Sequence, residues 1–198
     1  MSKNRQIISR LLQVIEENIA PMTAREVVRG NKVFGAAILL KKDLSLVIAQ
    51  TNNEIENPLW HGEMHTIKKL YERDRSTLPN PSDCIFLSTH EPCSLCLSAI
   101  TWAGYDNFYY LFSHENSRDK FNIPHDLKIL KEVFTLDAGG YAKENAFWKA
   151  HDIINEIAIM NEPQKTQFQN KVQHITKIYD KLSKNYQDGK GSANIPLA

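Results

Sequence analysis

Two short motifs carry an imidazole, a carboxylate and two thiols that form one site only if the fold brings the motifs together. The first motif is His61-x-Glu63, and the second is Pro92-Cys93-x-x-Cys96. An imidazole and two thiolates suit Zn²⁺, and catalytic zinc sites take three protein ligands and leave the fourth position to water. The sequence therefore predicts that His61, Cys93 and Cys96 bind zinc, while Glu63 stays free to move protons.

Local geometry accounts for the spacing inside each motif. Pro92 suits the first position of a helix, and Cys93 and Cys96 are three residues apart, so both sulfurs face one way from the first turn. The positive N-terminal end of that helix favours anionic sulfur, the form that binds metal. Glu63 follows His61 by two residues at the expected start of another helix. Its carboxylate is therefore expected to reach a metal-bound water without being a ligand.

Parts of the pattern also fit other sites. His65 would complete a structural Cys2His2 zinc site with His61, Cys93 and Cys96. A redox dithiol accounts for the two cysteines but leaves His61 and Glu63 without a role. The metalloprotease pattern H-E-x-x-H does not fit, because the glutamate follows the first histidine by two residues rather than one.

Together with their apolar flanks, the motifs resemble the signature of the zinc-dependent cytidine-deaminase-like superfamily, in its nucleobase and nucleoside deaminase branch. The matching segments are 61–67 and 88–100. The resemblance covers about residues 4–135 and implies a three-layer α/β/α fold with a five-stranded mixed sheet, plus C-terminal helices. It implies Zn²⁺ as cofactor and hydrolytic deamination of a free base or nucleoside of the cytosine or guanine type, with Glu63 transferring the protons.

The same resemblance implies a set of substrate contacts. It assigns Asn52, or else Asn53, to base recognition from the loop after the second strand. It places the backbone of Gly62 and Glu91 beside the substrate. Phe34 is expected to line the pocket, although core packing explains an aromatic side chain on a strand equally well.

The motifs disagree about the substrate. Gly62, where many relatives have alanine, resembles the small zinc cytosine deaminases, whereas Glu91 before the Pro-Cys pair resembles guanine and tRNA-adenosine deaminases. Cytosine deaminases close the pocket with aromatic residues of a C-terminal helix, and Phe147 and Trp148 are candidates for that role. Ordinary helix packing is the competing interpretation of both side chains.

Composition limits the partners and the compartment. The chain has 198 residues, a formal net charge of +1 and three cysteines. So small a charge gives little general attraction to a phosphate backbone, which makes tRNA editing the weaker alternative. Two of the cysteines belong to the motif, which fits a reducing compartment, and no apolar run is long enough to cross a membrane. We expect a cytoplasmic enzyme for a small molecule; the resemblance implies a homodimer or larger homo-oligomer, and a non-catalytic zinc-binding scaffold is the alternative.

Hydrophobic periodicity predicts alternating helices and strands. Helices are expected at 4–19, 22–29, 61–74 and 93–103, and strands at 33–40, 44–49, 84–88, 107–112 and 132–136. The first helix is expected to end before Pro21.

From residue 141 onward the pattern becomes helical, with a break at Glu162-Pro163. We therefore expect a catalytic domain over residues 1–140 and a helical extension over 141–187 that packs on the core or on a partner subunit. The polar, glycine-containing stretch 188–198 is expected to be a flexible tail.

Overall fold

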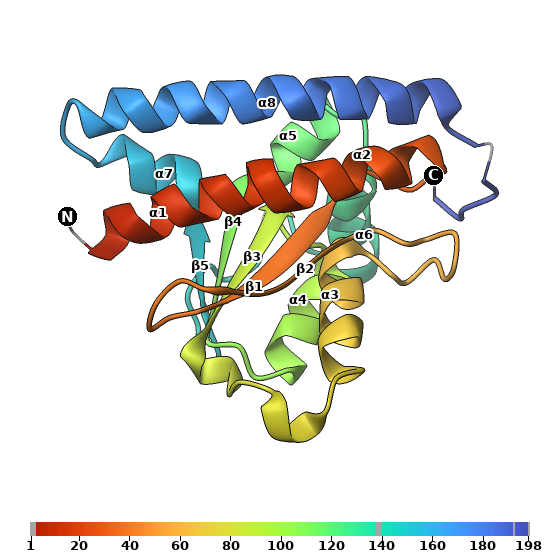
Figure 1. Ribbon diagram of the computed structural model, residues 1–198. Helices are drawn as coiled ribbons and strands as arrows, with labels where there is room; N and C mark the ends of the chain where they lie inside the picture. The colour runs from red at the N-terminus through yellow and green to blue at the C-terminus, as the bar shows by residue number, and fades with distance from the viewer. Residues whose placement is uncertain (1–2, 138–139, 192, 198) are drawn as a thin grey trace.

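The computed structural model of the protein describes residues 3–137, 140–191 and 193–197. Its centre is a five-stranded sheet with helices on both faces (Figure 1). The strands are β1 (Gly35–Leu40), β2 (Leu46–Thr51), β3 (Cys84–His90), β4 (Asn107–Phe112) and β5 (Lys149–Asp152). The α-helices are α1 (Lys3–Val14), α2 (Ala20–Val28), α3 (Gly62–Tyr71), α4 (Ser94–Trp102), α5 (His114–Asp119), α6 (His125–Phe134), α7 (Ile153–Ala158) and α8 (Gln164–Gly189).

The sheet is mixed, with strand order β2-β1-β3-β4-β5. β1 pairs antiparallel with β2 and β3, whereas β3 with β4 and β4 with β5 are parallel pairs. β3 and β4 are buried along their whole length, as expected for strands covered on both faces. This arrangement confirms the predicted three-layer α/β/α fold with a five-stranded mixed sheet.

Helices form a layer on each face of the sheet. α8 runs along α1 and α2 at the top of Figure 1, and α3 and α4 lie on the opposite face. Successive residues of β1 serve the two layers in turn: Ala37 and Leu39 belong to the core under α1 and α8, and Ala36 and Ile38 to the core under α3 and α4. This alternation is the period of two that a strand imposes on its side chains.

The expected end of the first helix before Pro21 is wrong. The chain stays helical to Val28, through a π-helical turn at Ile15–Ile19. Pro21 directly follows this π-helical turn, in the first turn of α2. The change of hydrogen-bond pattern at the π-helical turn accommodates a residue that has no N–H and whose ring crowds the preceding turn, so the helical path continues past the proline.

The expected fifth strand at 132–136 is also wrong. Residues up to Phe134 belong to α6, and Thr135 ends that helix in a left-handed conformation. The fifth strand is β5, whose sequence Lys-Ala-His-Asp has no apolar run and lies in a region expected to be helical. An edge strand that pairs with β4 alone needs less burial, so its sequence gives little strand signal. The sheet therefore extends past residue 140.

The remaining C-terminal segment is helical, with the expected break at Glu162-Pro163 between α7 and α8. α8 buries Phe168, Ile175 and Tyr179 in the same core as α1, so the extension packs on the core. Beyond α8, the described part of the segment expected to be flexible includes a buried Ile195. Within the described residues, no helix has both the length and the apolar character of a membrane span.

Candidate zinc site and active-site cavity

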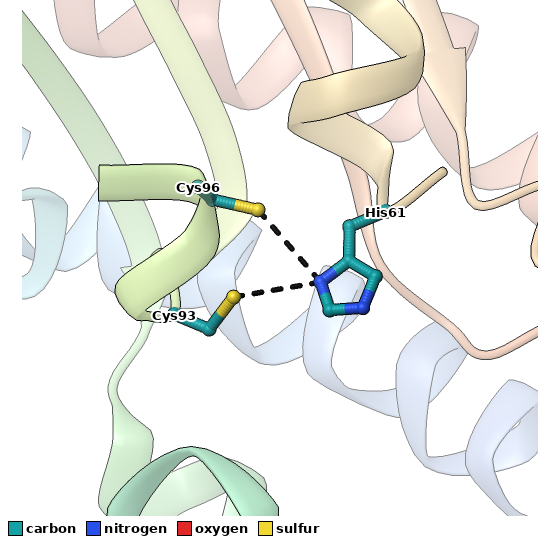
Figure 2. A group of neighbouring side chains, drawn as sticks. All are labelled: His61, Cys93 and Cys96. Atoms are coloured by element: carbon teal, nitrogen blue, oxygen red, sulfur yellow. Dashed lines mark hydrogen bonds between the residues drawn. The ribbon is translucent and has the colours of Figure 1, made fainter. Parts of the chain in front are cut away.

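The two motifs meet because each begins a helix on the same face of the sheet. His61 is the N-cap of α3, and Cys93 is the N-cap of α4 with Cys96 in the first turn (Figure 2). Cys93 has extended backbone angles, so Pro92 precedes the cap and does not take the first helical position as expected. Both helix N-termini, together with the side chains of His61, Cys93 and Cys96, point to the same place.

The three donor atoms have the separations that zinc requires. His61 Nδ1 lies 3.5 Å from Cys93 Sγ and 3.8 Å from Cys96 Sγ. With bonds of about 2.3 Å to sulfur and about 2.0 Å to nitrogen, a tetrahedral zinc ion separates a nitrogen donor from a sulfur donor by about 3.5 Å. His65 does not join them: its Nδ1 lies 2.8 Å from Thr51 O, and among the described residues the donor atoms gathered within 4.8 Å of one another are those of His61, Cys93 and Cys96. The donors therefore fit an open three-ligand site, and the structural Cys2His2 alternative is not supported.

Electrostatics also favour a cation at this place. A hydrogen bond from the Cys96 thiol is the largest of the effects that lower the pKa of the Cys93 thiol well below its ordinary value. Burial opposes protonation of His61, but its contact with Cys93 outweighs burial and raises the pKa of the imidazole to about 9. A positive charge is thus favoured between these groups, and both cysteines are free of disulfides.

Glu63 lies beside the donors in the first turn of α3. Ser88 Oγ donates a hydrogen bond to Glu63 Oε1 at 2.5 Å, and Glu63 Oε2 is 3.2 Å from Cys96 Sγ. Burial, followed by the negative charge of Cys93, raises the pKa of Glu63 above its ordinary value. A carboxyl group that is held in place and binds a proton readily is suited to proton transfer.

Close packing against β1 requires glycine at position 62. A Cβ at this position would lie 2.6 Å from the Cα of Gly35 in β1, so α3 and β1 approach too closely for a side chain. Its N–H donates a hydrogen bond to Asn52 Oδ1. The glycine that resembled cytosine deaminases thus has a structural explanation in this chain, and it says little about the substrate.

A cavity of about 320 Å³ adjoins the zinc donors, with Phe34, His61 and Cys93 in its wall. An inner recess continues to the carboxyl of Glu63 and is lined also by Glu91. The structure therefore brings both Phe34 and Glu91 to the place where a substrate would meet the metal. The contact of either residue with a substrate stays a prediction.

The position of Asn52 differs from that expected of a residue that contacts a base directly. It is fully buried, and it is not one of the residues that line the cavity. Its Nδ2 donates to Glu54 Oε2 at 2.8 Å, and its Oδ1 accepts the N–H of Gly62. Both ends of the amide are engaged within the protein, which favours a structural role.

The structure does not support a capping role for Trp148. Its indole packs edge to face against Phe108 and donates a hydrogen bond to Thr101 Oγ1 at 2.8 Å. The ring belongs to the core under α3 and α4, and Phe147 beside it is 69% exposed. The packing interpretation is therefore the better one for Trp148.

Three groups of residues in the cavity wall were not expected from the sequence. Asp126, from α6, lines both the cavity and the inner recess, and its carboxyl has no hydrogen bond or ion pair with another described residue. Burial raises the pKa of Asp126 to about 8. A buried ion pair, Lys32–Glu54, forms part of the wall, as do Pro196 and Leu197. None of these residues is near a motif, and only their positions in space reveal them.

Comparisons with known proteins agree with this geometry. Residues 13–112 match the family model described as the cytidine and deoxycytidylate deaminase zinc-binding region. Guanine deaminase of Bacillus subtilis (strain 168) is 31% identical over 94 residues, which cover 43% of this chain and 54% of that protein. The match thus spans about half the length of this curated relative.

Solved structures share the fold. The crystal structure of a mutant of NE0047 in complex with 8-azaguanine matches with a TM-score of 0.50 and 15% identity, over 82% of this chain and 80% of that one. Guanine deaminase from Nitrosomonas europaea matches with a TM-score of 0.48 and 16% identity, over 82% of each chain. The family match and the three donors identify the metal site as a zinc site. The chain belongs to the family of the cytidine and deoxycytidylate deaminase zinc-binding region.

Proposed function

We propose that the protein is a zinc-dependent hydrolytic deaminase that converts the exocyclic amine of a free nucleobase or nucleoside to a carbonyl and releases ammonia. One observation carries this proposal: the proton-binding carboxyl of Glu63 shares an inner recess with the three zinc donors. A cavity of about 320 Å³ at this recess is of a size for a small molecule.

The chemistry divides between the metal and the protein. Bound by His61, Cys93 and Cys96, zinc supplies a Lewis acid that makes water a better nucleophile at neutral pH. Glu63 takes a proton from the attacking water and delivers it to the ring nitrogen next to the reacting carbon. Glu63 then transfers the second water proton to the amine, which leaves as ammonia, so the overall change is addition of water and loss of ammonia. Ser88 orients the carboxyl through its hydrogen bond to Oε1.

We propose that guanine-type bases are the preferred substrates, with Asp126 as the distinguishing group. In guanine, the carbon that bears the amine lies between a ring N–H and a ring nitrogen with a lone pair. The carboxyl of Asp126 has an oxygen that accepts from that N–H in either protonation state, while Glu63 protonates the other nitrogen. In cytosine, one neighbour of the reacting carbon is a C–H group, which gives this oxygen no partner. The similarity to a guanine deaminase supports the same choice.

Ammonia release tests the activity. We expect zinc-loaded protein to release ammonia from guanine faster than from cytosine, adenine or their nucleosides. Glu63→Gln is expected to lower the rate by about 10²- to 10⁴-fold, because general acid–base catalysis typically contributes that much. Its zinc content should be unchanged, because Glu63 is not a metal donor. Glu72→Gln, at the exposed end of the same helix, is the matched control.

The scaffold alternative predicts a different result. If Glu63→Gln and the unsubstituted protein behave alike on every amine in this panel while both hold zinc, the deaminase proposal is wrong.

We also propose a homodimer and a cytoplasmic location. Trp102 at the end of α4 is 91% exposed, and contact with a second copy of the chain would remove its large apolar ring from water. The described cysteines are all free, which supports a reducing compartment.

A further inference from the structure

A buried ion pair occupies the wall of the cavity beside the zinc donors. Lys32 Nζ lies 2.7 Å from Glu54 Oε1, and the side chains of both residues are almost fully buried, with 7% and 1% exposed. The backbone N–H of Lys32 also donates to Glu54 Oε2 at 3.3 Å. Lys32 precedes β1 and Glu54 follows β2, so the pair joins the loops at one end of two neighbouring strands.

Glu54 also connects to the start of α3. Its Oε1 lies 3.8 Å from His61 Nε2, the ring nitrogen that does not face the cysteines. Its Oε2 accepts a hydrogen bond from Asn52 Nδ2, and Asn52 Oδ1 accepts the N–H of Gly62. One carboxylate thus faces the ring of the zinc donor at 3.8 Å and connects to the backbone next to that donor through Asn52.

The two ring nitrogens of His61 then have separate tasks. When Nδ1 gives its lone pair to a metal, the proton of the neutral imidazole is on Nε2. A carboxylate that faces Nε2 favours that tautomer, restricts rotation of the ring and raises the basicity of Nδ1. Lys32 holds the carboxylate in position, because its ammonium group lies 2.7 Å from Oε1.

A purely structural purpose explains the pair less well. Taking two charges out of water costs roughly as much free energy as their attraction returns, so a buried ion pair is weak evidence for stability. The pair lies in the cavity wall and not in the apolar core under α8. Its position beside a zinc donor therefore accounts for it better than stability does.

We propose that Glu54 is a positioning residue for the zinc ligand His61, and that Lys32 keeps Glu54 in place for this task. The proposal depends on the zinc site and not on the identity of the substrate. Zinc affinity, measured by competition with a chromophoric chelator, is therefore the test, and it needs no assay of deamination.

Three variants separate the carboxylate from the ion pair. Glu54→Gln removes the charge but keeps the size of the side chain, and Lys32→Met removes the cation. The double variant Lys32→Met/Glu54→Gln leaves no unpaired buried charge, so it guards against a simple failure to fold. Glu56→Gln, in the same loop but half-exposed and 3.7 Å from Lys68, is the matched control.

We expect both variants that lack the carboxylate to bind zinc about 10- to 100-fold more weakly, which is the usual effect of removing such a partner of a ligand. Lys32→Met should lose less affinity, about threefold to tenfold, because the carboxylate that faces His61 is still present but is no longer held by the ammonium group. Glu56→Gln should stay within about threefold of the original, because Glu56 does not face His61. Thermal unfolding of the metal-free proteins reports stability separately.

Two results would overturn the proposal. One is an unchanged zinc affinity in the double variant. The other is an equal loss of affinity in Lys32→Met and Glu54→Gln in proportion to their loss of stability, which is what a merely structural ion pair predicts.

Discussion

At the residue scale, Asp126 is the group on which substrate preference depends. Its carboxyl lines the inner recess without a partner among the described residues, so a substrate N–H is its natural donor. We expect Asp126→Ala to lower kcat/KM for guanine by about 10- to 100-fold, because a substrate N–H left without an acceptor in a buried site costs about 1–3 kcal/mol. Activity on cytosine should change much less.

Steady-state rates of ammonia release from guanine and from cytosine measure these changes in kcat/KM. Zinc content is the control, because Asp126 is not a donor. An equal loss on guanine and cytosine would contradict a role in specificity.

His90 gives the protein a predictable response to acid. It is buried at the end of β3 among Phe34, Phe112, Phe121 and Tyr179, and burial lowers its pKa from 6.5 to about 3. Below pH 6.5 the unfolded chain takes up a proton at this position while the folded protein does not. The contribution of His90 to the free energy of unfolding therefore falls by about 1.4 kcal/mol per pH unit as the pH decreases from 6.5 towards 3.

Comparison with His90→Phe isolates this effect. Urea unfolding at pH 7.5, 6.0 and 5.0 should show that the original protein loses stability relative to the variant as the pH falls. A constant difference between the two proteins over this range would show that His90 does not titrate as proposed.

The sequence predicts the chemistry of individual residues well where motifs define it. The zinc donors and Glu63 can be recognised from the spacing within each motif. Each motif lies at a helix N-terminus, where the local helix geometry determines how its side chains are presented. Asn52 and Trp148 were assigned by resemblance alone, and the structure engages both within the protein. Such contacts depend on packing between distant segments, which the order of residues does not show.

At the element scale, the errors have physical causes. Proline is a signal for the end of a helix, but at Pro21 a π-helical turn directly before it lets the helical path continue. The apolar residues around Phe134 resemble a strand, but Val133 and Phe134 lie in the last turn of α6 and are exposed. β5 was missed because an edge strand of Lys, Ala, His and Asp has no pattern of its own. The buried central strands, in contrast, were found from their apolar runs.

The segment after α8 contributes Leu197 to the cavity, and a substitution there can test whether the segment affects substrate binding. Leu197 lines the cavity but is 60% exposed, so it belongs to the rim. We expect Leu197→Asp to raise KM severalfold, because a charge at an apolar rim disfavours a flat, neutral base. It should leave the melting temperature nearly unchanged, since little apolar area is lost. Kinetics and thermal unfolding measure the two effects, and Leu197→Met is the conservative control.

A change in melting temperature without a change in KM would place Leu197 in the core and not at the cavity.

At the scale of the whole molecule, the proposed homodimer needs a contact surface, and the surface around Trp102 at the end of α4 is our candidate for it. Trp102 is 91% and Phe147 is 69% exposed, and their chain neighbours Thr101 and Trp148 are hydrogen bonded to one another, so the two lie in one region. Burial of an indole on association contributes a large apolar area. A second copy of the chain would cover the same surface on both partners, as a two-fold interface requires.

This arrangement predicts how one substitution changes the molecular mass in solution. We expect the protein to be dimeric at micromolar concentrations by light scattering, and Trp102→Asp to shift it to the monomer. Ile159→Asp removes another exposed apolar side chain, 79% exposed at the end of α7, and should leave the mass unchanged. If both variants keep the dimer, the interface lies elsewhere; if the original protein is a monomer, the exposed indole needs a different partner. The zinc donors, Glu63 and Asp126 all lie within one chain, so a monomeric Trp102→Asp should keep its zinc and its activity per site.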